Sequence, residues 1–272
     1  MLPYFGAPDW KLGPIPIHGF GILVAIGCLL GARLVERRGA QVGLDARATS
    51  SLITWVLVGG FAGAHWFDLL AYTPEKIKED PWIIVKFWAG ISSYGGFMGA
   101  ILAMFIFLKR RGLPVLPFAD ALALGLSVGW VFGRAGCTIA HDHVGRATHF
   151  FLAFKYPPHN TQGIEPGVHH NLGFYEFLYA IVLAGGLHWL AKKPRPSGLI
   201  VGILATAYAP VRYVLDPLRS AKTDPRYWGL TPAQWLSAVT LVVGLLIIRH
   251  ALKKNEVLPF VAPKPTRKRA HA

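Results

Sequence analysis

The chain has 272 residues, of which 53% are hydrophobic and only 15% are charged. A soluble domain usually carries about 25% charged residues, so this composition excludes an ordinary soluble protein and indicates a polytopic membrane protein. The net charge of +14 does not imply a nucleic-acid partner, because the basic residues fall between apolar segments and in the C-terminal tail. Basic residues in those places orient membrane helices and contact anionic lipid.

A helix that crosses a bilayer needs about 20 mostly apolar residues. The sequence predicts seven such helices, at residues 17–34, 51–72, 94–108, 119–136, 173–191, 199–215 and 231–248. The third is short unless it extends back through residues 82–88. We therefore expect an all-α polytopic membrane protein with seven transmembrane helices and a small external loop or head region.

Basic residues in the connections predict how the helices are oriented. They cluster in the first, third and fifth connections and in the tail, at Arg33, Arg37, Arg38, Arg47, Lys109, Arg110, Arg111, Lys192, Lys193, Arg195 and Lys254. Positive residues favour the cytoplasm, so we expect the N-terminus outside and the C-terminus inside. The second and sixth connections also hold Lys and Arg, so the prediction rests on consistency among the loops.

Three regions follow from this orientation. Residues 1–258 form one seven-helix membrane domain without a cleavable signal peptide, because the first basic cluster follows the first apolar stretch. Residues 137–172 form a long external loop, and loops of that length are usually functional. Residues 259–272 are basic and proline-containing, and we expect a disordered cytoplasmic tail.

Strongly polar residues in the apolar segments lie at the external end of those segments. They are His18, His65, Asp68, Tyr94, Arg134, His170, Glu176, Arg212 and Asp216. A charged side chain at the centre of a membrane helix costs about 2.5–3.5 kcal/mol to insert and usually marks function. The pattern predicts an active site at the external membrane interface.

The densest motif runs from Gly133 to Arg146 and reads GRAGCTIAHDHVGR. Its glycines allow a sharp chain reversal where the helix leaves the membrane. The guanidinium of Arg134 matches phosphate oxygens, although an isolated arginine can also extend to lipid headgroups. A second arginine, Arg212, on another helix favours the phosphate interpretation. Arg212 can pair with Asp216 four residues later, and this pair is either a structural ion pair or part of a phosphate site.

The loop after this helix carries potential zinc ligands: Cys137, His141, Asp142 and His143. Residues one or two positions apart rarely converge on one ion without an enforced turn. We therefore expect no metal and no other cofactor.

Two further motifs have plain structural alternatives. His170, Tyr175 and Glu176 flank the entry to the fifth helix, where they orient a substrate or cap the helix. Tyr94 opens the third helix, where an interfacial tyrosine is often an aromatic anchor.

At these residues the sequence resembles the prolipoprotein diacylglyceryl transferase family over roughly residues 14–248. The family signature reads approximately GRxGNFxNxExxGR. It is matched here at Gly133, Arg134, Gly136, Gly145 and Arg146, with Asp142 in place of the acid. Further matches follow in register, at His18, His170, Tyr175, Glu176, Arg212, Asp216, Arg219 and residues 230–237.

The resemblance implies a multi-pass enzyme of the bacterial inner (plasma) membrane whose active site faces the periplasm or outer leaflet. Such enzymes move the diacylglyceryl group of phosphatidylglycerol onto the lipobox cysteine of a prolipoprotein and release glycerol phosphate. The implied partners are phosphatidylglycerol, prolipoprotein signal peptides and membrane lipid.

The sequence departs from the family at several positions. Tyr94 stands where the family has a histidine proposed as the catalytic base, and Cys137 and Ala140 replace the two signature asparagines. Phe20 stands where the family usually has a tyrosine. The chain is therefore a divergent member by its motifs.

We divide the implied site into two sets of residues. The catalytic set is Arg134, Arg212, Tyr94, His141, His143 and His170. The substrate-binding set is Gly133, Gly136, Asp142, Gly145, Arg146, Tyr175, Glu176, Asp216, Arg219 and His18.

Each set has a chemical rationale. Arg134 and Arg212 hold the donor phosphate, with Arg146 or Arg219 assisting. The base that accepts the thiol proton is one of the three histidines, whose ordinary pKa suits the role. Tyr94, with an ordinary pKa near 10, is better suited to donate a hydrogen bond.

Other functions fit part of the pattern. Loss of the family histidine and asparagines is compatible with a pseudo-enzyme that binds lipid or lipoprotein without transfer, and the same donor with a different acceptor is equally consistent. A transporter fits less well, because the inner halves of the helices carry no comparable set of buried charges.

Overall fold

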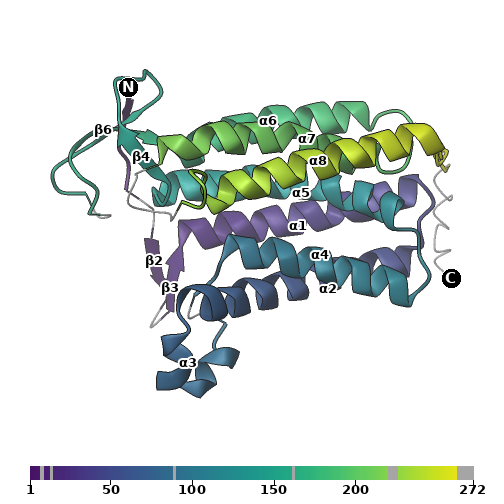
Figure 1. Cartoon of the computed structure of the whole chain (residues 1–272), viewed down its shortest axis with the longest axis horizontal. Helices are drawn as coiled ribbons and strands as arrows, with labels where there is room; N and C mark the ends of the chain where they lie inside the picture. The colour runs from purple at the N-terminus through teal and green to yellow at the C-terminus, as the bar shows by residue number, and fades with distance from the viewer. Residues whose placement is uncertain (7–8, 13–14, 88–89, 161–162, 220–225, 262–272) are drawn as a thin grey trace, which may run out of the picture. The chain divides into compact units, whose positions relative to one another are not determined.

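The computed structural model describes residues 1–261 except for residues 7–8, 13–14, 88–89, 161–162 and 220–225. It is mostly helical (Figure 1). The chain divides into two compact units. The first contains residues 1–34 and 120–260, and the second contains residues 35–119 and Val261. The expected tail falls almost wholly outside the described residues; at its start, the Val261 amide donates to the Gln41 carbonyl at 2.9 Å.

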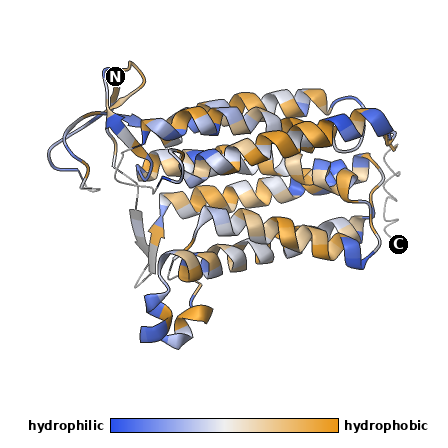
Figure 2. Ribbon diagram, in the orientation of Figure 1, coloured by the Kyte–Doolittle hydropathy of each residue, from blue (hydrophilic) through white to orange (hydrophobic). Residues whose placement is uncertain are grey.

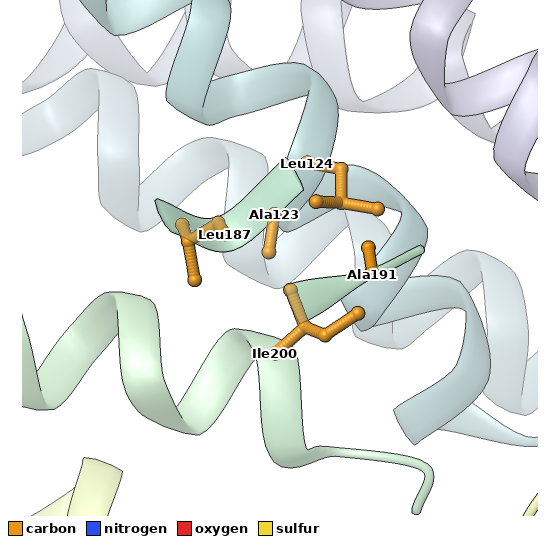
Figure 3. Close-up of a cluster of buried hydrophobic side chains, with 5 residues drawn as sticks. All are labelled: Ala123, Leu124, Leu187, Ala191 and Ile200. Carbon is orange, nitrogen blue, oxygen red and sulfur yellow. The ribbon is translucent and has the colours of Figure 1, made fainter. Parts of the chain in front are cut away.

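Long apolar helices build the first unit. They are most of α1 (Gly19–Gln41) and α5 (Val115–Ala140), together with α6 (Leu172–Leu190), α7 (Leu199–Leu215) and α8 (Pro232–Lys254). Helix α7 packs along α8 and also contacts α6. Figure 3 shows one buried cluster of this unit, formed by Ala123, Leu124, Leu187, Ala191 and Ile200.

A buried carboxylate fixes one end of α7. Asp120 of α5 accepts hydrogen bonds from the amides of Gly198 (2.7 Å) and Val201 (2.9 Å). These amides belong to the first turn of α7, where backbone donors lack partners within the helix. Gly198 has no side chain for this purpose and takes a left-handed φ of 96°. Asp120 therefore supplies the cap from another helix.

A small sheet lies at one end of α6, α7 and α8 (Figure 1). Its strand order is β1-β5-β6-β4, formed by β1 (Leu2–Pro3), β4 (Val144–Ala147), β5 (Phe154–Tyr156) and β6 (Gly167–Asn171). A separate antiparallel hairpin joins β2 (Asp9–Leu12) to β3 (Ile15–His18). The predicted external loop is thus a folded head: its first residues extend α5 to Ala140, and the N-terminus contributes a strand.

The second unit is organised around α2 (Ala46–Phe67) and α4 (Ser93–Arg110), which pack together along their length. The chain segment that connects α2 to α4 forms a π-helical turn (η1, Asp68–Tyr72), α3 (Glu75–Glu79) and a 3-10 helix (η2, Pro81–Val85). His65 is fully buried, and its Nδ1 and Nε2 atoms lie 3.1 Å and 2.9 Å from the carbonyl oxygens of Gly90 and Ile83. This histidine therefore tethers the connecting segment to α2.

Six of the described helical stretches are long and apolar enough to cross a membrane: 19–41, 46–72, 115–140, 172–190, 199–218 and 232–254. Apolar residues dominate along these helices (Figure 2). The chain is therefore a polytopic membrane protein. The predicted third span corresponds to α4, which is not among the six; it has only 18 residues and ends in Lys109 and Arg110.

Close glycine contacts join α2 to α4. A Cβ added at Gly63 would lie 2.5 Å from the Gly95 carbonyl oxygen, and one at Gly99 would lie 2.2 Å from the Gly59 carbonyl oxygen. Such backbone approach is typical of membrane helices with small residues at their interface. A Cβ at Gly60, in the same helix, would have its nearest contact at an ordinary 3.5 Å.

These contacts predict opposite outcomes for two alanine substitutions. Gly63→Ala forces α2 and α4 apart and lowers the unfolding free energy by roughly 1–3 kcal/mol, the usual range for overpacking. Gly60→Ala leaves stability nearly unchanged. Unfolding by denaturing detergent measures both, and equal stability of the two variants would contradict this packing.

Candidate active site

An arginine, a glutamate and a tyrosine from three helices meet at the head end of the first unit. The Nη2 atom of Arg134 (α5) lies 2.8 Å from Oε2 of Glu176 (α6) and 3.2 Å from the hydroxyl of Tyr208 (α7). Tyr208 also donates to Glu176 at 2.6 Å. Glu176 is 0% exposed. The three groups are therefore hydrogen-bonded to one another in the interior of the helix bundle.

A second arginine extends this network. Arg212 Nη2 lies 3.2 Å from Asp216 Oδ1, and Arg212 Nη1 lies 3.9 Å from Glu176 Oε1. The other Asp216 oxygen accepts from the hydroxyl of Thr231, which caps α8 with Gln234 in a reciprocal capping box. The network of Arg134, Glu176, Arg212 and Asp216 thus joins α5, α6 and α7 to the start of α8.

The network is neutral but not fully satisfied. Its two guanidinium groups balance its two carboxylates, as buried charges require. Arg212 Nη1 and Glu176 Oε1 nevertheless make no hydrogen bond although both atoms are buried. An unsatisfied buried donor costs about 1–3 kcal/mol, and an oxygen of a bound phosphate would satisfy this one.

Two aromatic residues of the site were not predicted. The Arg134 guanidinium lies 4.6 Å from the ring centroid of Trp130, which meets Tyr208 edge-on at 5.3 Å. An aromatic face stabilises an arginine by cation–π attraction. In sequence both residues resemble ordinary packing residues of apolar helices. Helical spacing could have identified them, because each lies four residues before one of the two arginines.

His141 directs the chain away from the end of α5. It takes a left-handed φ of 52° and is almost fully buried. Its Nε2 lies 2.8 Å from the Phe5 carbonyl, and its Nδ1 lies 3.0 Å from the Tyr156 hydroxyl and 3.1 Å from the Asn171 amide nitrogen. A carbonyl only accepts, so Nε2 carries the proton. The reversal expected at the signature glycines therefore occurs at His141, with Gly133 and Gly136 still inside α5.

The reversal brings Asp142 and His143 back towards Cys137. One ligand atom from each of these three residues lies within 4.8 Å of the others. Asp142 Oδ1 is 2.6 Å from His143 Nδ1, and Arg134 Nη1 lies 4.0 Å from the Cys137 sulfur. The cluster therefore adjoins the arginine network.

His170 and Tyr175 form a second polar pair between β6 and α6. The His170 Nδ1 atom lies 2.9 Å from the Tyr175 hydroxyl. Burial lowers the pKa of His170 below the ordinary histidine value, and the nearby Arg146 and His169 lower it further. His170 is therefore mainly neutral near pH 7, as a general base must be.

Arg146 and Arg219 lie where β4 meets the segment after α7. Arg146 donates to the Pro217 carbonyl, and Gly145 forms an isolated bridge with Arg219. A Cβ at Gly145 would lie 2.5 Å from the Leu218 carbonyl oxygen, so only glycine allows this approach.

Four further predicted residues are His18, Gly136, Tyr94 and Asp68. His18 is exposed at the end of β3, directly before α1. Gly136 packs on Phe20, because an added Cβ would lie 2.8 Å from that ring. Tyr94 and Asp68 lie in the second unit, at the start of α4 and the end of α2, and their roles stay predictions.

A family model described as prolipoprotein diacylglyceryl transferase matches residues 9–250. The chain belongs to this family. It is 29% identical to a protein of Chromohalobacter salexigens named phosphatidylglycerol–prolipoprotein diacylglyceryl transferase, over 83% of this chain and 82% of that one. Relatives with the same name from Tolumonas auensis and Vibrio atlanticus are 26% and 29% identical, each over 90% of this chain and 95% and 90% of theirs. The predicted family resemblance is confirmed.

Glu176 carries the largest expected contribution to stability in this site. Glu176→Leu leaves Arg134 and Arg212 without their shared counter-charge, and it lowers the unfolding free energy by about 3–5 kcal/mol. Glu176→Gln loses less, because the amide still bonds Tyr208. Thermal unfolding in detergent measures both, with the exposed Glu165→Gln as the matched control. A Glu176→Leu protein as stable as the control would contradict the network.

Proposed function

We propose that this protein transfers the diacylglyceryl group of phosphatidylglycerol to the lipobox cysteine of prolipoproteins. The observation that carries the proposal is the buried arginine network, in a chain of a family whose members are named for this reaction. In this reaction a carbon–sulfur bond forms and a carbon–oxygen bond to the phosphate breaks. The electron pair of the broken bond goes to the phosphate oxygen, and glycerol phosphate leaves.

Arg134 and Arg212 stabilise the charge that develops on the leaving phosphate. Glu176 holds both guanidinium groups, which spares them reorganisation during the reaction. Arg212 Nη1 supplies the first new hydrogen bond to the phosphate, because it is a buried guanidinium donor of this network that makes no hydrogen bond. Arg146 and Arg219 assist from the β4 side, while Gly133, Gly136 and Gly145 shape the backbone around the lipid headgroup.

The acceptor thiol also needs a base, since only the thiolate is an effective nucleophile. We assign this role to His170, with Tyr175 orienting its ring. His141 is better suited to position the chain, because hydrogen bonds occupy both its ring nitrogens. Tyr94 donates a hydrogen bond to substrate in place of the family histidine, and His18 contacts substrate at the entrance to α1.

We further propose seven transmembrane helices, with α4 as the span additional to the six. The N-terminus lies outside and the C-terminus inside the bacterial inner membrane. This orientation places the head and the arginine network at the periplasmic face, where prolipoprotein signal peptides and outer-leaflet lipid meet. Residues 1–258 then form one membrane domain, and residues 259–272 form a basic cytoplasmic tail.

A transfer assay tests the proposed function. Purified protein, phosphatidylglycerol and a lipobox peptide are combined, and the mass of the peptide and the release of glycerol phosphate are followed. We expect a diacylglyceryl-sized mass gain of the peptide. The rate of transfer falls on the order of 10²–10³-fold in Arg134→Ala, the usual effect of losing one donor to a developing charge. Lys193→Gln, in the connection between α6 and α7, is the control.

The assay separates the proposal from its main alternative. A fully active Arg134→Ala protein would remove the phosphate assignment. If wild-type protein retains phosphatidylglycerol without any peptide product while a typical family enzyme is active, the protein is a lipid-binding pseudo-enzyme or uses another acceptor.

The pH dependence of transfer tests the base. A base works in its neutral form, and the lowered pKa of His170 predicts that transfer persists as the pH falls below about 6.5. Arg146→Gln removes a positive charge beside His170, so the acidic limb of the profile moves to higher pH. Lys155→Gln, an exposed cation of the same head, leaves the limb in place. A profile unchanged by Arg146→Gln would reject His170.

A further inference from the structure

Cys137, Asp142 and His143 combine three kinds of metal ligand in one small volume. Their sulfur, carboxylate oxygen and imidazole nitrogen atoms all lie within 4.8 Å of one another. Zinc binds these three atom types at about 2.0–2.3 Å, which separates ligand atoms by roughly 3.3–3.7 Å in a tetrahedral site. Binding would therefore separate Asp142 Oδ1 from His143 Nδ1, which now lie 2.6 Å apart, and would turn the side chains so that all three ligand atoms face the ion.

The buried turn at His141 explains how residues so close in sequence converge. A regular helix would carry Asp142 and His143 onward, away from Cys137. The left-handed conformation of His141 reverses the chain, and its hydrogen bonds to Phe5 and Tyr156 hold the reversal in place. The enforced turn that the spacing alone did not predict is therefore present.

Charge and access also suit a cation. Arg134 is the cation nearest the cysteine in the described contacts, but Glu176 neutralises it at 2.8 Å. A Cys137 thiolate and the Asp142 carboxylate would leave two negative charges for a divalent ion. The side chains of Asp142 and His143 are 42% and 25% exposed, so solvent reaches one side of the cluster.

We propose that Cys137, Asp142 and His143 bind a zinc ion with a fourth position open. The mixture of a soft sulfur ligand with imidazole and carboxylate favours zinc over magnesium or calcium. Three protein ligands and an open position are typical of catalytic rather than structural zinc.

The role of this ion rests on the proposed function. A zinc ion deprotonates a thiol that coordinates it. The acceptor cysteine takes the open position as a thiolate, and its proton passes to His170. Its sulfur then bonds the diacylglyceryl carbon while the carbon–oxygen bond to phosphate breaks. Metal activation of the thiol would compensate for the tyrosine at position 94.

Metal content and cobalt spectroscopy test the site without reference to activity. Protein purified through a tag that lacks histidine is stripped with chelator, reloaded with zinc or cobalt and washed. We expect one ion per chain and, for cobalt, a sulfur-to-metal charge-transfer band. Cys137→Asn abolishes both, and it is expected to fold because the family signature carries asparagine there. Cys28→Ala and His149→Gln, which change the other cysteine and another head histidine, retain both.

The outcomes are distinct from those of the transfer assay. Absence of stoichiometric metal in the wild type, or its retention in Cys137→Asn with an unchanged melting temperature, would overturn the site. Metal bound in the wild type without any transfer would leave the site in place and reject the proposed function. Transfer that survives complete removal of the metal would reject the role in thiol activation.

Discussion

The head end of the first unit depends on the ion pairs that the buried carboxylate of Glu176 forms with two arginines. Two arginines enter the apolar bundle from α5 and α7, and a single fully buried carboxylate on α6 faces both. Without it, Asp216 would be the one carboxylate left in the network, and one positive charge would remain unbalanced in a region with little water to solvate it. Asp216 completes the balance and also fixes the start of α8 through Thr231. The same contacts that make burial of the arginines possible therefore also tie four helices together.

This arrangement has a consequence for chemistry. Under the proposed function, the phosphate of the donor lipid would enter a neutral network that retains a buried donor without a hydrogen bond, and not an empty positive pocket. Binding would then be driven by satisfaction of that donor and by guanidinium groups already held in position. Such preorganisation stabilises the charge that develops on a leaving group more than the charge of the bound substrate.

The starts of the helices were predictable to within five residues because their signal is local. The sixth predicted span and α7 have the same bounds, 199–215. Helix α1 continues to Gln41, beyond the predicted end at residue 34, because arginines that end an apolar window do not end a helix. The strands were missed because they pair across long separations, as Leu2 does with Phe154.

The common location of Arg134, Glu176 and Arg212 was predicted, but their mutual neutralisation depends on side-chain geometry. The role of His141 depends on the carbonyl of Phe5, which no local pattern reveals.

Retention of donor lipid tests whether the arginine network is the phosphate site. Protein in nanodiscs of mixed phosphatidylglycerol and phosphatidylethanolamine, without acceptor peptide, is examined by native mass spectrometry for the lipid that stays bound. We expect selective retention of phosphatidylglycerol by the wild type and by Lys193→Gln, and its loss in Arg212→Gln. Equal retention of both lipids by the wild type, or unchanged selectivity in Arg212→Gln, would contradict it.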